Sequence, residues 1–442
     1  MKKWVVEGGH RLSGQVEIGG AKNVAIKLMI AALLSDAETT LSNVSQVGDV
    51  LLTAKMIRAL GAEVEFMPDG QVTVLPRDLC RFTLPPSLAR QNRAASLFIG
   101  PLLSRCGTLE IPLPGGDRIG RRPLDRHLAG LRALGAHVER KSDFLLIKQD
   151  GLRGAEIRFN KNTHTGTETM ILAAVLAAGT TAIENAAMEP EIDDLIDLVN
   201  KMGARVKRVS PRRIVIEGVA RLHGATHRVM PDRNKAVSYA CMALATRGEV
   251  EITNMDCKLV SAFLDFLDQT GGHYDVGADR LHVAYQSRLR PVAVTTSPYP
   301  GIMSDWQPLI TTLLTQAEGQ STVHETIFEN RFGYVAELAR MGAQIEMYRP
   351  ELPDDPQPIY NFNWQDRRQD LFHALQIKGP TNLRGTKVHV NDVRAGATLV
   401  QAALTAKGTS ILTGVEHIKR GYERLDGHLR SLGAHIEEVE DT

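Results

Sequence analysis

The chain lacks the short motifs that mark the common catalytic classes. It contains no GxxxxGK(S/T) loop, no HExxH helix, no GxSxG turn and no GxGxxG following a strand. These absences leave no support for nucleotide hydrolysis at a P-loop, zinc proteolysis, serine hydrolysis or dinucleotide redox chemistry. Any catalysis must therefore come from a less common arrangement of residues.

Cysteine and aromatic residues are scarce. The four cysteines, Cys80, Cys106, Cys241 and Cys257, show no CxxC spacing, so we expect small core residues and neither a metal site nor a disulfide framework. Aromatic residues make up 5% of the chain and the net charge is +1. Nucleic-acid binding normally needs a basic stripe with stacking residues, so no nucleic-acid partner is expected.

Long apolar runs are also missing. No 18 consecutive apolar residues occur, and the opening MKKWVVEG reaches charge and glycine too soon for a signal peptide. We therefore expect no membrane insertion and a cytoplasmic location. With 442 residues, 43% of them hydrophobic and 23% charged, the chain can bury large cores, and two domains are predicted.

One eight-residue phrase occurs six times along the chain. In each copy, apolar residues at helical spacing lead into a Gly-Ala or Gly-Gly pair and then a residue typical of a strand. This pattern predicts a helix that ends at the glycine and is followed at once by a strand. The separations are 74, 68, 68, 71 and 91 residues, which indicates six copies of one unit. The glycines are Gly61, Gly135, Gly203, Gly271, Gly342 and Gly433.

A second phrase precedes each of these helices, and it consists of an alanine- and leucine-rich run, usually a glycine, and an alternating strand. The clear copies span 173–184, 242–253, 313–325 and 402–413, and the weaker ones span 31–43 and 101–112. The repeating unit is therefore helix, strand, connection, helix, strand, which predicts an α/β fold. The alternative is a set of ordinary helix caps, which would require six copies in register by chance.

Charged residues interrupt the repeats at a few places. Lys22 lies in a glycine-rich turn between a predicted strand and a helix, where an ammonium group beside helix N-terminal amides suits a phosphate or carboxylate. The loop 113–127 holds three glycines, two prolines, four arginines and two aspartates, and is typical of a lid that closes on a ligand. The alternatives are a solvated lysine and a mobile, charged surface turn.

Further charge occurs at the start of predicted helices in the second half of the chain. Asp305 follows a proline-interrupted segment and precedes an apolar helix, so its carboxylate could cap that helix or act as a base facing a cleft. Segments 391–394 and 417–424 place more ionisable groups in the last repeat. Taken singly, each is also typical of a salt-bridged surface.

These segments together resemble the enolpyruvyl transferase family over residues 5–438. The resemblance rests on six motifs: GGAKN at 19–23, PGGxxIGxRP at 114–123, ENAAxEPEI at 184–192, PDR at 231–233, FENRF at 328–332 and HIxRGYER at 417–424. It implies two similar α/β domains of three repeats each, an inside-out α/β barrel, with the active site in a cleft between them. The first domain would be 22–230 with a lid loop at 112–123, and the second 1–21 plus 231–442.

The resemblance also implies a reaction. The enolpyruvyl group of phosphoenolpyruvate would pass to the 3-hydroxyl of UDP-N-acetylglucosamine with release of phosphate, which is the first committed step of peptidoglycan synthesis. No cofactor or metal is expected. The implied catalytic residues are Lys22, Asp117, Asp305 and Arg420, with Asp305 as the base. The implied substrate-binding residues are Lys22, Asn23, Arg93, Arg122, Pro123, Leu124, Asp125, Thr163, His164, Thr165, Asp305, Ile327, Asp392, Arg394 and Arg420.

The chain departs from the family pattern at three places. Asp117 occupies a lid position that is usually cysteine, and a carboxyl group can donate a proton to C3 but cannot be alkylated as a thiol is. We therefore expect insensitivity to the epoxide fosfomycin. Segments 163–166 and 234–237 also differ, and both changes bear on which acceptor is used. An insertion at about 349–383, rich in proline, lengthens the fifth interval and is read as surface decoration, a partner contact or part of an altered acceptor pocket.

Three functions remain open from the sequence. The first is the reaction just described, and the second is enolpyruvyl transfer to another nucleotide or nucleotide sugar. The third is a catalytically weak paralogue that binds nucleotide sugar and regulates or scaffolds. The oligomeric state is not indicated.

Overall fold

The computed structural model describes residues 2–77, 79, 83–117 and 119–440. Cys80 and Arg118, which belong to the sequence predictions above, lie outside these ranges. Cys241 and Cys257 are buried as expected, whereas Cys106 is partly exposed. Within the described ranges, no helix combines the length and the apolar character needed to cross a membrane.

The chain is built from six copies of one α/β unit, which confirms the predicted fold class. Each copy contains a buried first helix, a strand, an amphipathic second helix and an antiparallel hairpin. The first helices are α1 (Lys22–Ala31), α4 (Ile99–Cys106), α6 (His164–Ala174), α8 (Arg233–Ala245), α10 (Gln307–Leu314) and α12 (Val393–Thr405). The strands that follow them are β3 (Thr39–Ser42), β6 (Thr108–Pro112), β10 (Thr180–Glu184), β14 (Glu249–Thr253), β18 (Gly319–His324) and β22 (Gly408–Thr413).

The second helix of each copy ends at one of the six repeated glycines, as the spacing predicts. All six glycines have positive φ, between 75° and 103°, a conformation that side-chain-bearing residues rarely adopt. The second helices are α2 (Gly48–Ala59), α5 (Asp125–Ala133), α7 (Pro190–Lys201), α9 (Ser261–Thr270), α11 (Val335–Arg340) and α14 (Leu425–Ser431).

The hairpin after each second helix forms one side of a sheet. Five hairpins are continuous, and the sixth joins the last strand to the first. The pairs are β4 (Glu63–Phe66) with β5 (Val72–Leu75), β7 (His137–Arg140) with β8 (Phe144–Lys148), β11 (Arg205–Ser210) with β12 (Arg213–Glu217), β15 (His273–Val276) with β16 (Arg280–Ala284), β19 (Gln344–Tyr348) with β20 (Ala374–Gly379), and β23 (His435–Glu440) with β1 (Lys2–Gly8).

A parallel strand completes each sheet at the far edge. Five are β2 (Ser13–Glu17), β9 (Glu156–Arg158), β13 (Thr226–Arg228), β17 (Ala293–Thr295) and β21 (Lys387–His389). In the sheet β6-β8-β7, the parallel bridge of Thr83 to Glu110 takes that place. The described sheets are therefore open, with three or four strands each, and none closes into a barrel. The remaining short helices are α3 (Pro86–Ala89), α13 (Glu416–Lys419), η1 (Ala32–Leu34), η2 (Arg93–Phe98), η3 (Cys257–Val260) and η4 (Trp364–Asp366).

The chain divides into two compact units, each with three of the described sheets and its own hydrophobic core. Unit 1 comprises Met1–Gly19, Arg118–Arg122 and Pro231–Thr442, and unit 2 comprises Gly20–Asp117 and Pro123–Met230. The segment Arg118–Arg122, the second half of the predicted lid loop, thus groups with unit 1.

In each unit, one parallel edge strand lies directly before the point where the chain crosses to the other unit. β2 pairs with β14 of unit 1, although the next helix, α1, belongs to unit 2. β13 pairs with β3 of unit 2, although the next helix, α8, belongs to unit 1. Unit 1 therefore needs both β1 and β2 from the start of the chain to complete two of its sheets.

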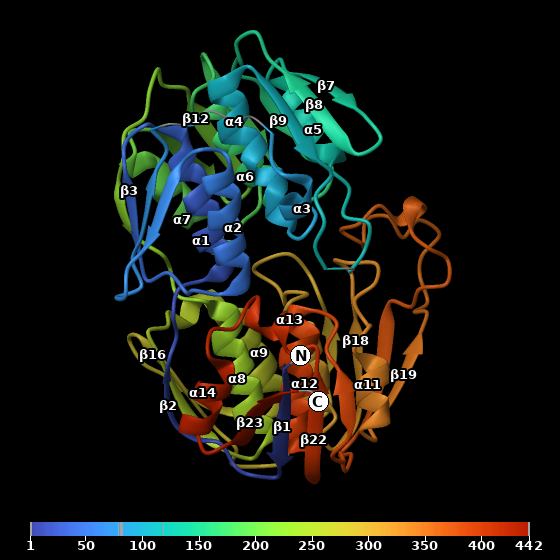
Figure 1. Ribbon diagram of the computed structural model, residues 1–442. Coiled ribbons are helices and arrows are strands. Elements are labelled where there is room, and N and C mark those ends of the chain that lie inside the picture. Colours follow the sequence, from blue (N-terminus) through green and yellow to red (C-terminus); the bar gives the residue numbers. More distant parts are fainter. Residues whose placement is uncertain (1, 78, 80–82, 118, 441–442) are drawn as a thin grey trace. The chain divides into compact units, whose positions relative to one another are not determined.

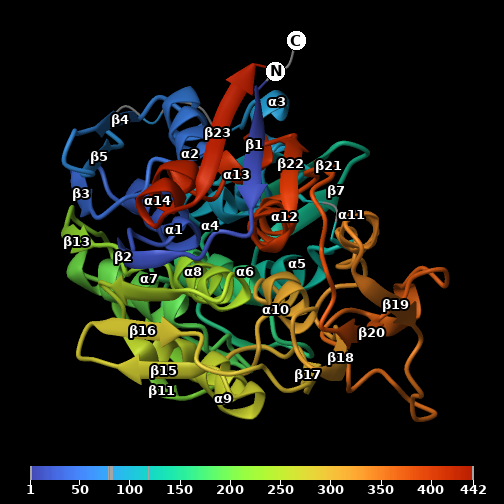
Figure 2. The same ribbon diagram turned by 90° about the horizontal axis from the view of Figure 1, so that it is seen from below.

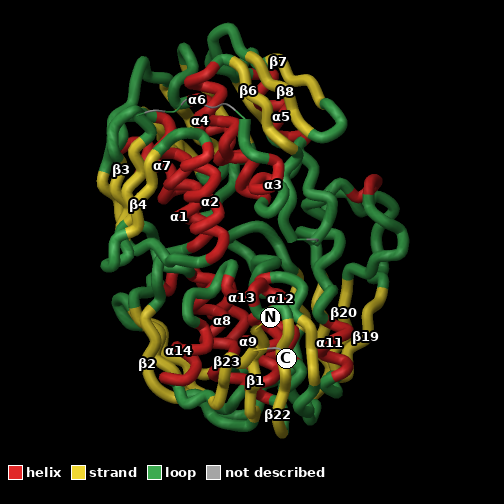
Figure 3. Tube along the Cα trace, in the orientation of Figure 1, coloured by secondary structure: helices red, strands yellow, loops and turns green. Residues whose placement is uncertain are grey.

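The first helices form the centre of each unit. All residues of α8 are buried, and α8, α10 and α12 pack against one another. A helix that is buried on every side needs side chains around its whole circumference that are apolar or hydrogen-bonded within the protein. The second helices, which are amphipathic, need this on one face only. Figure 3 shows helices inside and strands at the periphery of each unit in the orientation of Figure 1. Figure 2 shows the three sheets of unit 1 on different sides of α8, α10 and α12.

The predicted insertion forms an ordered connection between β19 and β20. Tyr360 stacks on Trp364, with 4.3 Å between ring centroids and 13° between planes, and the Arg367 guanidinium lies 3.5 Å from the Trp364 ring centroid. His373 is 3% exposed beside these rings. Burial, then Arg367 and other nearby cations, lower the pKa of His373 to about 4, so its ring is neutral at pH 7. The insertion therefore carries a small core of its own.

Candidate active site

Asp305 of unit 1 is held by two buried arginines. Its Oδ1 accepts a hydrogen bond from Arg331 Nη2 at 3.1 Å, and its Oδ2 accepts one from Arg394 Nε at 3.1 Å. The arginines are 5% and 6% exposed, whereas a quarter of the Asp305 side chain remains accessible. Both oxygens are thus fixed in direction, and the carboxylate is positioned to act on a proton brought to its open side.

The carboxylate of Asp305 does not cap the helix that follows. α10 begins at Gln307, its N-cap residue is Trp306, and no side chain accepts a hydrogen bond at this N-terminus. Pro308 in the first turn removes one of the amides that would need a cap. The sequence left open whether Asp305 caps this helix, and in the structure it does not.

Asp392 and Arg394 flank the start of α12. Asp392 is the N-cap residue, and its Oδ1 accepts from the backbone amides of Arg394 and Ala395 at 2.9 Å each. The same oxygen lies 3.9 Å from Arg331 Nη1. The cap fixes Asp392, and Arg331 thereby contacts both acidic side chains of the group. The structure thus brings the predicted residues Asp305, Asp392 and Arg394 together.

Arg394 continues this network inward. Its Nη1 donates to the Tyr422 hydroxyl at 3.0 Å, and that hydroxyl lies 2.8 Å from Ser238 Oγ. Burial lowers the pKa of Arg394, but Tyr422, Asp305 and Asp232 outweigh it, and the pKa is raised above its ordinary value. Arg394 therefore stays charged at any working pH.

Ile327 lies in a turn that a buried carboxylate organises. Glu325 Oε1 accepts from the backbone amides of Ile327 at 2.8 Å and Phe328 at 3.0 Å, and Oε2 accepts from Ser304 Oγ at 3.0 Å. Burial raises the pKa of Glu325, while Arg331 and these donors act in the opposite direction. The bonds join the segment of Asp305 to the turn that carries Ile327 and Arg331.

The other predicted residues of unit 1 lie in loops. Arg122 has a positive φ of 44°, and Arg420 directly follows α13. The lid segment next to Arg122 is tied to the same turn as Ile327, because Ile119 O accepts from Asn330 N at 3.1 Å. Both arginines are partly exposed.

Lys22 of unit 2 is the first residue of α1 and pairs with an acidic residue of α2. Its Nζ donates to Asp49 Oδ2 at 3.0 Å, and the two residues are 8% and 4% exposed. Lys22 is therefore not the solvated lysine that the sequence left open. Asn23, next in the helix, is partly exposed. Asp117 of the lid is also partly exposed and belongs to unit 2.

Three residues of the predicted substrate-binding set, Thr163, His164 and Thr165, lie at the start of α6. Thr163 is the N-cap residue, and its Oγ1 accepts from Gly166 N at 3.1 Å. His164 Nε2 lies 2.9 Å from Lys27 Nζ and 3.2 Å from Glu168 Oε1, and Lys27 and Glu168 form a buried ion pair. Burial and Lys27 lower the pKa of His164, but Glu168 and Glu189 outweigh them and raise it. His164, Lys27 and Glu168 thus form a group of ionisable side chains beside the N-terminus of α6, and a helix N-terminus is a favourable place for an anion.

Thr165 connects this helix start to α5. Its hydroxyl lies 3.0 Å from His127 Nε2. Burial, together with Arg93 and Arg126, lowers the pKa of His127 to about 3, so the ring is neutral at pH 7. The neutral imidazole orients the Thr165 hydroxyl without adding charge.

Three further residues of the predicted substrate-binding set, Pro123, Leu124 and Asp125, lie at the start of α5. Arg93, at the start of η2, donates from Nη2 to Pro123 O at 3.3 Å. Leu124 packs on the core of unit 2, and Asp125 is the exposed first residue of α5. The structure therefore joins Arg93 to the segment 123–125.

Several residues of these networks were not predicted from the sequence. Arg331 and Tyr422 lie in motifs that carry the family resemblance, but no role was predicted for either side chain. Lys27 and Glu168 are buried charges in apolar helices, and that contrast is a signal that could have found them. Lys27 and Glu168 pair with each other across 141 positions, so finding that pair required the fold, whereas His164 lies one turn from Glu168 on the same helix.

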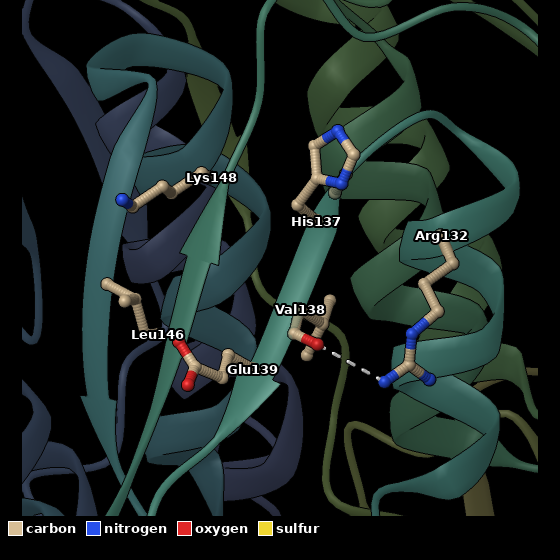
Figure 4. Close-up of a pocket in the computed structure, with 7 residues that line it drawn as sticks. Arg132, His137, Val138, Glu139, Leu146 and Lys148 are labelled. Atoms are coloured by element: carbon tan, nitrogen blue, oxygen red, sulfur yellow. Dashed lines mark hydrogen bonds between the residues drawn. The ribbon is translucent and has the colours of Figure 1, made fainter.

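A surface pocket of about 310 Å³ lies between α5 and the β7–β8 hairpin of unit 2 (Figure 4). Arg132 donates to Val138 O across it at 3.4 Å, and Lys148 and His137 also line it. None of the predicted substrate-binding residues lines this pocket. Among the described residues, the group suited to a metal ion consists of Glu7, His10 and His435, and it includes none of them either.

Three comparisons with known proteins agree with these motifs. A family model described as EPSP synthase (3-phosphoshikimate 1-carboxyvinyltransferase) matches residues 6–429. A curated protein of Carboxydothermus hydrogenoformans, UDP-N-acetylglucosamine 1-carboxyvinyltransferase 1, is 39% identical over 99% of both chains. A UDP-N-acetylglucosamine 1-carboxyvinyltransferase of Halorhodospira halophila is 38% identical over the whole of both chains.

Solved structures share the fold at lower identity. The enolpyruvyl transferase NikO from Streptomyces tendae matches with a TM-score of 0.87 and 24% identity, covering 100% of this chain and 99% of that one. An EPSP synthase from Acinetobacter baumannii matches with a TM-score of 0.72 and 17% identity over the whole of both chains. Because the family model and the curated relatives span nearly every residue, the chain belongs to the enolpyruvyl transferase family, that of EPSP synthase.

Proposed function

We propose that this protein transfers the enolpyruvyl group of phosphoenolpyruvate to the 3-hydroxyl of UDP-N-acetylglucosamine and releases phosphate. The observation that carries the proposal is the 38–39% identity, over essentially the full chain, to proteins named for this activity. The fixed carboxylate of Asp305 supports it, because the reaction needs a base at the sugar hydroxyl. The step would commit UDP-N-acetylglucosamine to peptidoglycan synthesis, and an enzyme of this step would work in the cytoplasm.

The proposed reaction is an addition followed by an elimination. Asp305 takes the proton of the 3-hydroxyl as that oxygen bonds to C2 of phosphoenolpyruvate, and Asp117 supplies a proton to C3. The C2–C3 double bond becomes a single bond in the tetrahedral intermediate. Loss of a proton from C3 then re-forms the double bond as the C2–O bond to phosphate breaks, which leaves the enolpyruvyl ether and inorganic phosphate.

Three cations are assigned to phosphoenolpyruvate. Lys22, Arg122 and Arg420 would bind its phosphate and carboxylate, with Arg93 and Asn23 orienting the two substrates. Lys22 donates to Asp49, so the phosphate would compete with or share this ammonium. The bond to Asp49 holds the ammonium at the start of α1.

The acceptor is assigned to the start of α6 and to the segment after the lid. Thr163, His164 and Thr165 would contact the diphosphate, where the raised pKa of His164 favours its cationic form. Ile327 would contact the sugar ring. Arg122, Pro123, Leu124 and Asp125 would lie near the uracil.

Asp392 and Arg394 are assigned to the reacting centre together with Asp305. Arg394 bonds directly to the proposed base, and Asp392 shares Arg331 with it. The segment 234–237, which departs from the family pattern, makes a hydrogen bond within unit 1. Asn234 Oδ1 accepts from Trp306 Nε1 at 2.8 Å, and Trp306 is the residue after Asp305. This bond gives no support to a different acceptor.

Phosphate release tests the proposal directly. The protein is mixed with phosphoenolpyruvate and UDP-N-acetylglucosamine, and Asp305→Ala is compared with Asp354→Ala, a change at an exposed residue of the insertion. We expect turnover that Asp305→Ala lowers by about 10²–10⁴-fold and that the control variant retains. Turnover only with another nucleotide sugar would overturn the assigned acceptor, and binding without turnover would overturn the assigned reaction.

A further inference from the structure

Two histidines and a glutamate meet where the first and last strands of the chain pair. Glu7 lies near the end of β1 and is directly opposite His435, the first residue of β23, in the antiparallel register. His10 follows three residues after Glu7, in the connection to β2. All three residues belong to unit 1, and the proposed reaction uses none of them.

The two imidazole rings direct nitrogens at one carboxylate. His10 Nε2 lies 3.6 Å from Glu7 Oε1, and His435 Nδ1 lies 3.2 Å from Glu7 Oε2. The rings are stacked, with 3.8 Å between centroids and 24° between planes. One ligand atom from each of the three residues can be chosen so that all lie within 4.8 Å of one another.

The two nitrogen–oxygen separations, 3.6 and 3.2 Å, are close to those between ligand atoms around a small metal ion. Zn²⁺ binds imidazole nitrogen and carboxylate oxygen at about 2.0–2.2 Å in tetrahedral geometry, which places neighbouring ligand atoms about 3.3–3.6 Å apart. Imidazole ligands favour zinc, copper and nickel over magnesium and calcium, which prefer sets made only of oxygen. Three protein ligands leave a fourth position for water.

We propose that Glu7, His10 and His435 bind a divalent transition-metal ion of the zinc type. Between 36% and 58% of each side chain is exposed, so an ion can enter from solvent and keep a water ligand without movement of the backbone. The ion would connect β1, the β1–β2 connection and β23. It would thereby fasten the first strand of the chain to the last one, in the sheet that the two ends build jointly.

Binding to the folded state alone would stabilise unit 1. Glu7 and His435 lie 428 residues apart in sequence, so an unfolded chain does not bring the three ligands together. A ligand present at about 100 times its dissociation constant raises the apparent stability through mass action alone. The site is therefore structural in character and separate from the proposed reaction.

The experiment uses the full chain without an affinity tag, stripped with a chelator and titrated with Zn²⁺ in a calorimeter. The test variants are His10→Gln, His435→Gln and the double change. The control is His282→Gln on β16 of the same unit, where the ring lies 2.9 Å from Glu249 Oε1 and 3.6 Å from Asp275 Oδ2. This histidine is outside the three-residue group proposed to bind the ion. Circular dichroism confirms that each variant is folded, and His10→Gln, in a connection, leaves the strand pairing intact.

We expect one Zn²⁺ per chain at this site, and a loss of affinity of about tenfold or more in each test variant. The thermal midpoint should rise with Zn²⁺ in the wild type and in His282→Gln but not in the double variant. Replacing Zn²⁺ with Co²⁺ should give visible absorption typical of tetrahedral coordination. Absence of binding at roughly 0.1 mM Zn²⁺, or binding that the double variant retains, would overturn the proposal.

Discussion

Arg331 contacts both acidic residues of the unit 1 cluster, Asp305 and Asp392. It is 5% exposed, and its Nε also donates to Ser304 O at 3.3 Å. A planar guanidinium can make these three contacts at once, whereas an ammonium cannot. Arg331 is therefore a positioning residue for the proposed base.

Replacing Arg331 with lysine should keep the charge and lose the geometry. We expect kcat to fall by about 10²-fold with little change in KM, because a small misplacement of a reacting group has an effect of that size. Arg331→Leu should in addition destabilise the fold by about 3–5 kcal/mol, since it leaves a partly buried carboxylate without one of its partners. Steady-state phosphate release and denaturant unfolding measure the two effects. Arg340→Lys, in an exposed pair with Glu337, is the control and should change neither.

Asp117 gives a second prediction at the residue scale. The wild-type chain should show no time-dependent loss of activity with fosfomycin, because a carboxyl group is not alkylated as a thiolate is. Asp117→Cys should acquire covalent labelling at residue 117, detected by mass spectrometry of the intact protein. Labelling of the lid loop in the wild type would contradict this expectation, and Cys106, partly exposed, provides an internal reference for nonspecific alkylation.

At the scale of elements, α14 has one glycine inside it and one just after its end, and the two differ in backbone conformation. Gly433 follows the helix with φ of 91°, and a Cβ there would be 3.6 Å from Arg11 O. Gly427 lies inside the helix, and a Cβ there would have no neighbour closer than 3.9 Å. Space is thus available at both positions, and the backbone decides the outcome.

We expect Gly433→Ala to lower the free energy of unfolding by about 1–2 kcal/mol, the strain of a left-handed alanine. Gly427→Ala should raise it by about 0.5–1 kcal/mol, because alanine is the better helix former. Urea unfolding of the two variants beside the wild type measures both. Equal effects of the same sign would show that φ at the repeated glycine does not control the stability of this helix end.

At the scale of the whole molecule, Glu438 joins the two ends of the chain. Its Oε1 accepts from Lys2 at 2.6 Å, and its Oε2 accepts from Trp4 Nε1 at 3.1 Å and from Lys419. Burial raises the pKa of Glu438, but the bonds from Lys2, Lys419 and Trp4 outweigh it and lower the pKa to about 2. Folding therefore favours the ionised form.

The sign of the pH dependence follows from this shift. Because the folded pKa lies below the ordinary value of 4.5, the stabilisation is complete above about pH 4.5 and is lost as the pH falls toward 2. Glu438→Gln should lower the stability by about 1 kcal/mol at pH 7 and progressively less below pH 4.5. Thermal unfolding across this range tests it, with the exposed Glu440→Gln as control. A difference that does not depend on pH would contradict the expected linkage.

Much of the fold could be predicted from the sequence because it is local and repeated. Helix spacing and a glycine at each helix end are set within a few residues, so the six copies and the α/β class were predictable. The pairing of β2 with β14 and of β13 with β3 cannot be read from the local pattern, because the strands of each pair are separated by about 190–240 residues and the helix that follows β2 or β13 belongs to the other unit. The aromatic cluster of the insertion also escaped prediction, since stacking of Tyr360 on Trp364 depends on how the connection folds back.

The sequence by itself determined the repeat, the helix ends and the family, because each depends on residue types at short, fixed spacings. Only the tertiary structure decided which charges meet. Asp305 could have capped α10, but Arg331 and Arg394, 26 and 89 positions away, take both of its oxygens. Likewise Glu7 and His435 stand opposite each other only because β1 completes the sheet of the last repeat. Electrostatic and hydrogen-bond partners are chosen by distance in space, and spacing along the chain does not encode that distance.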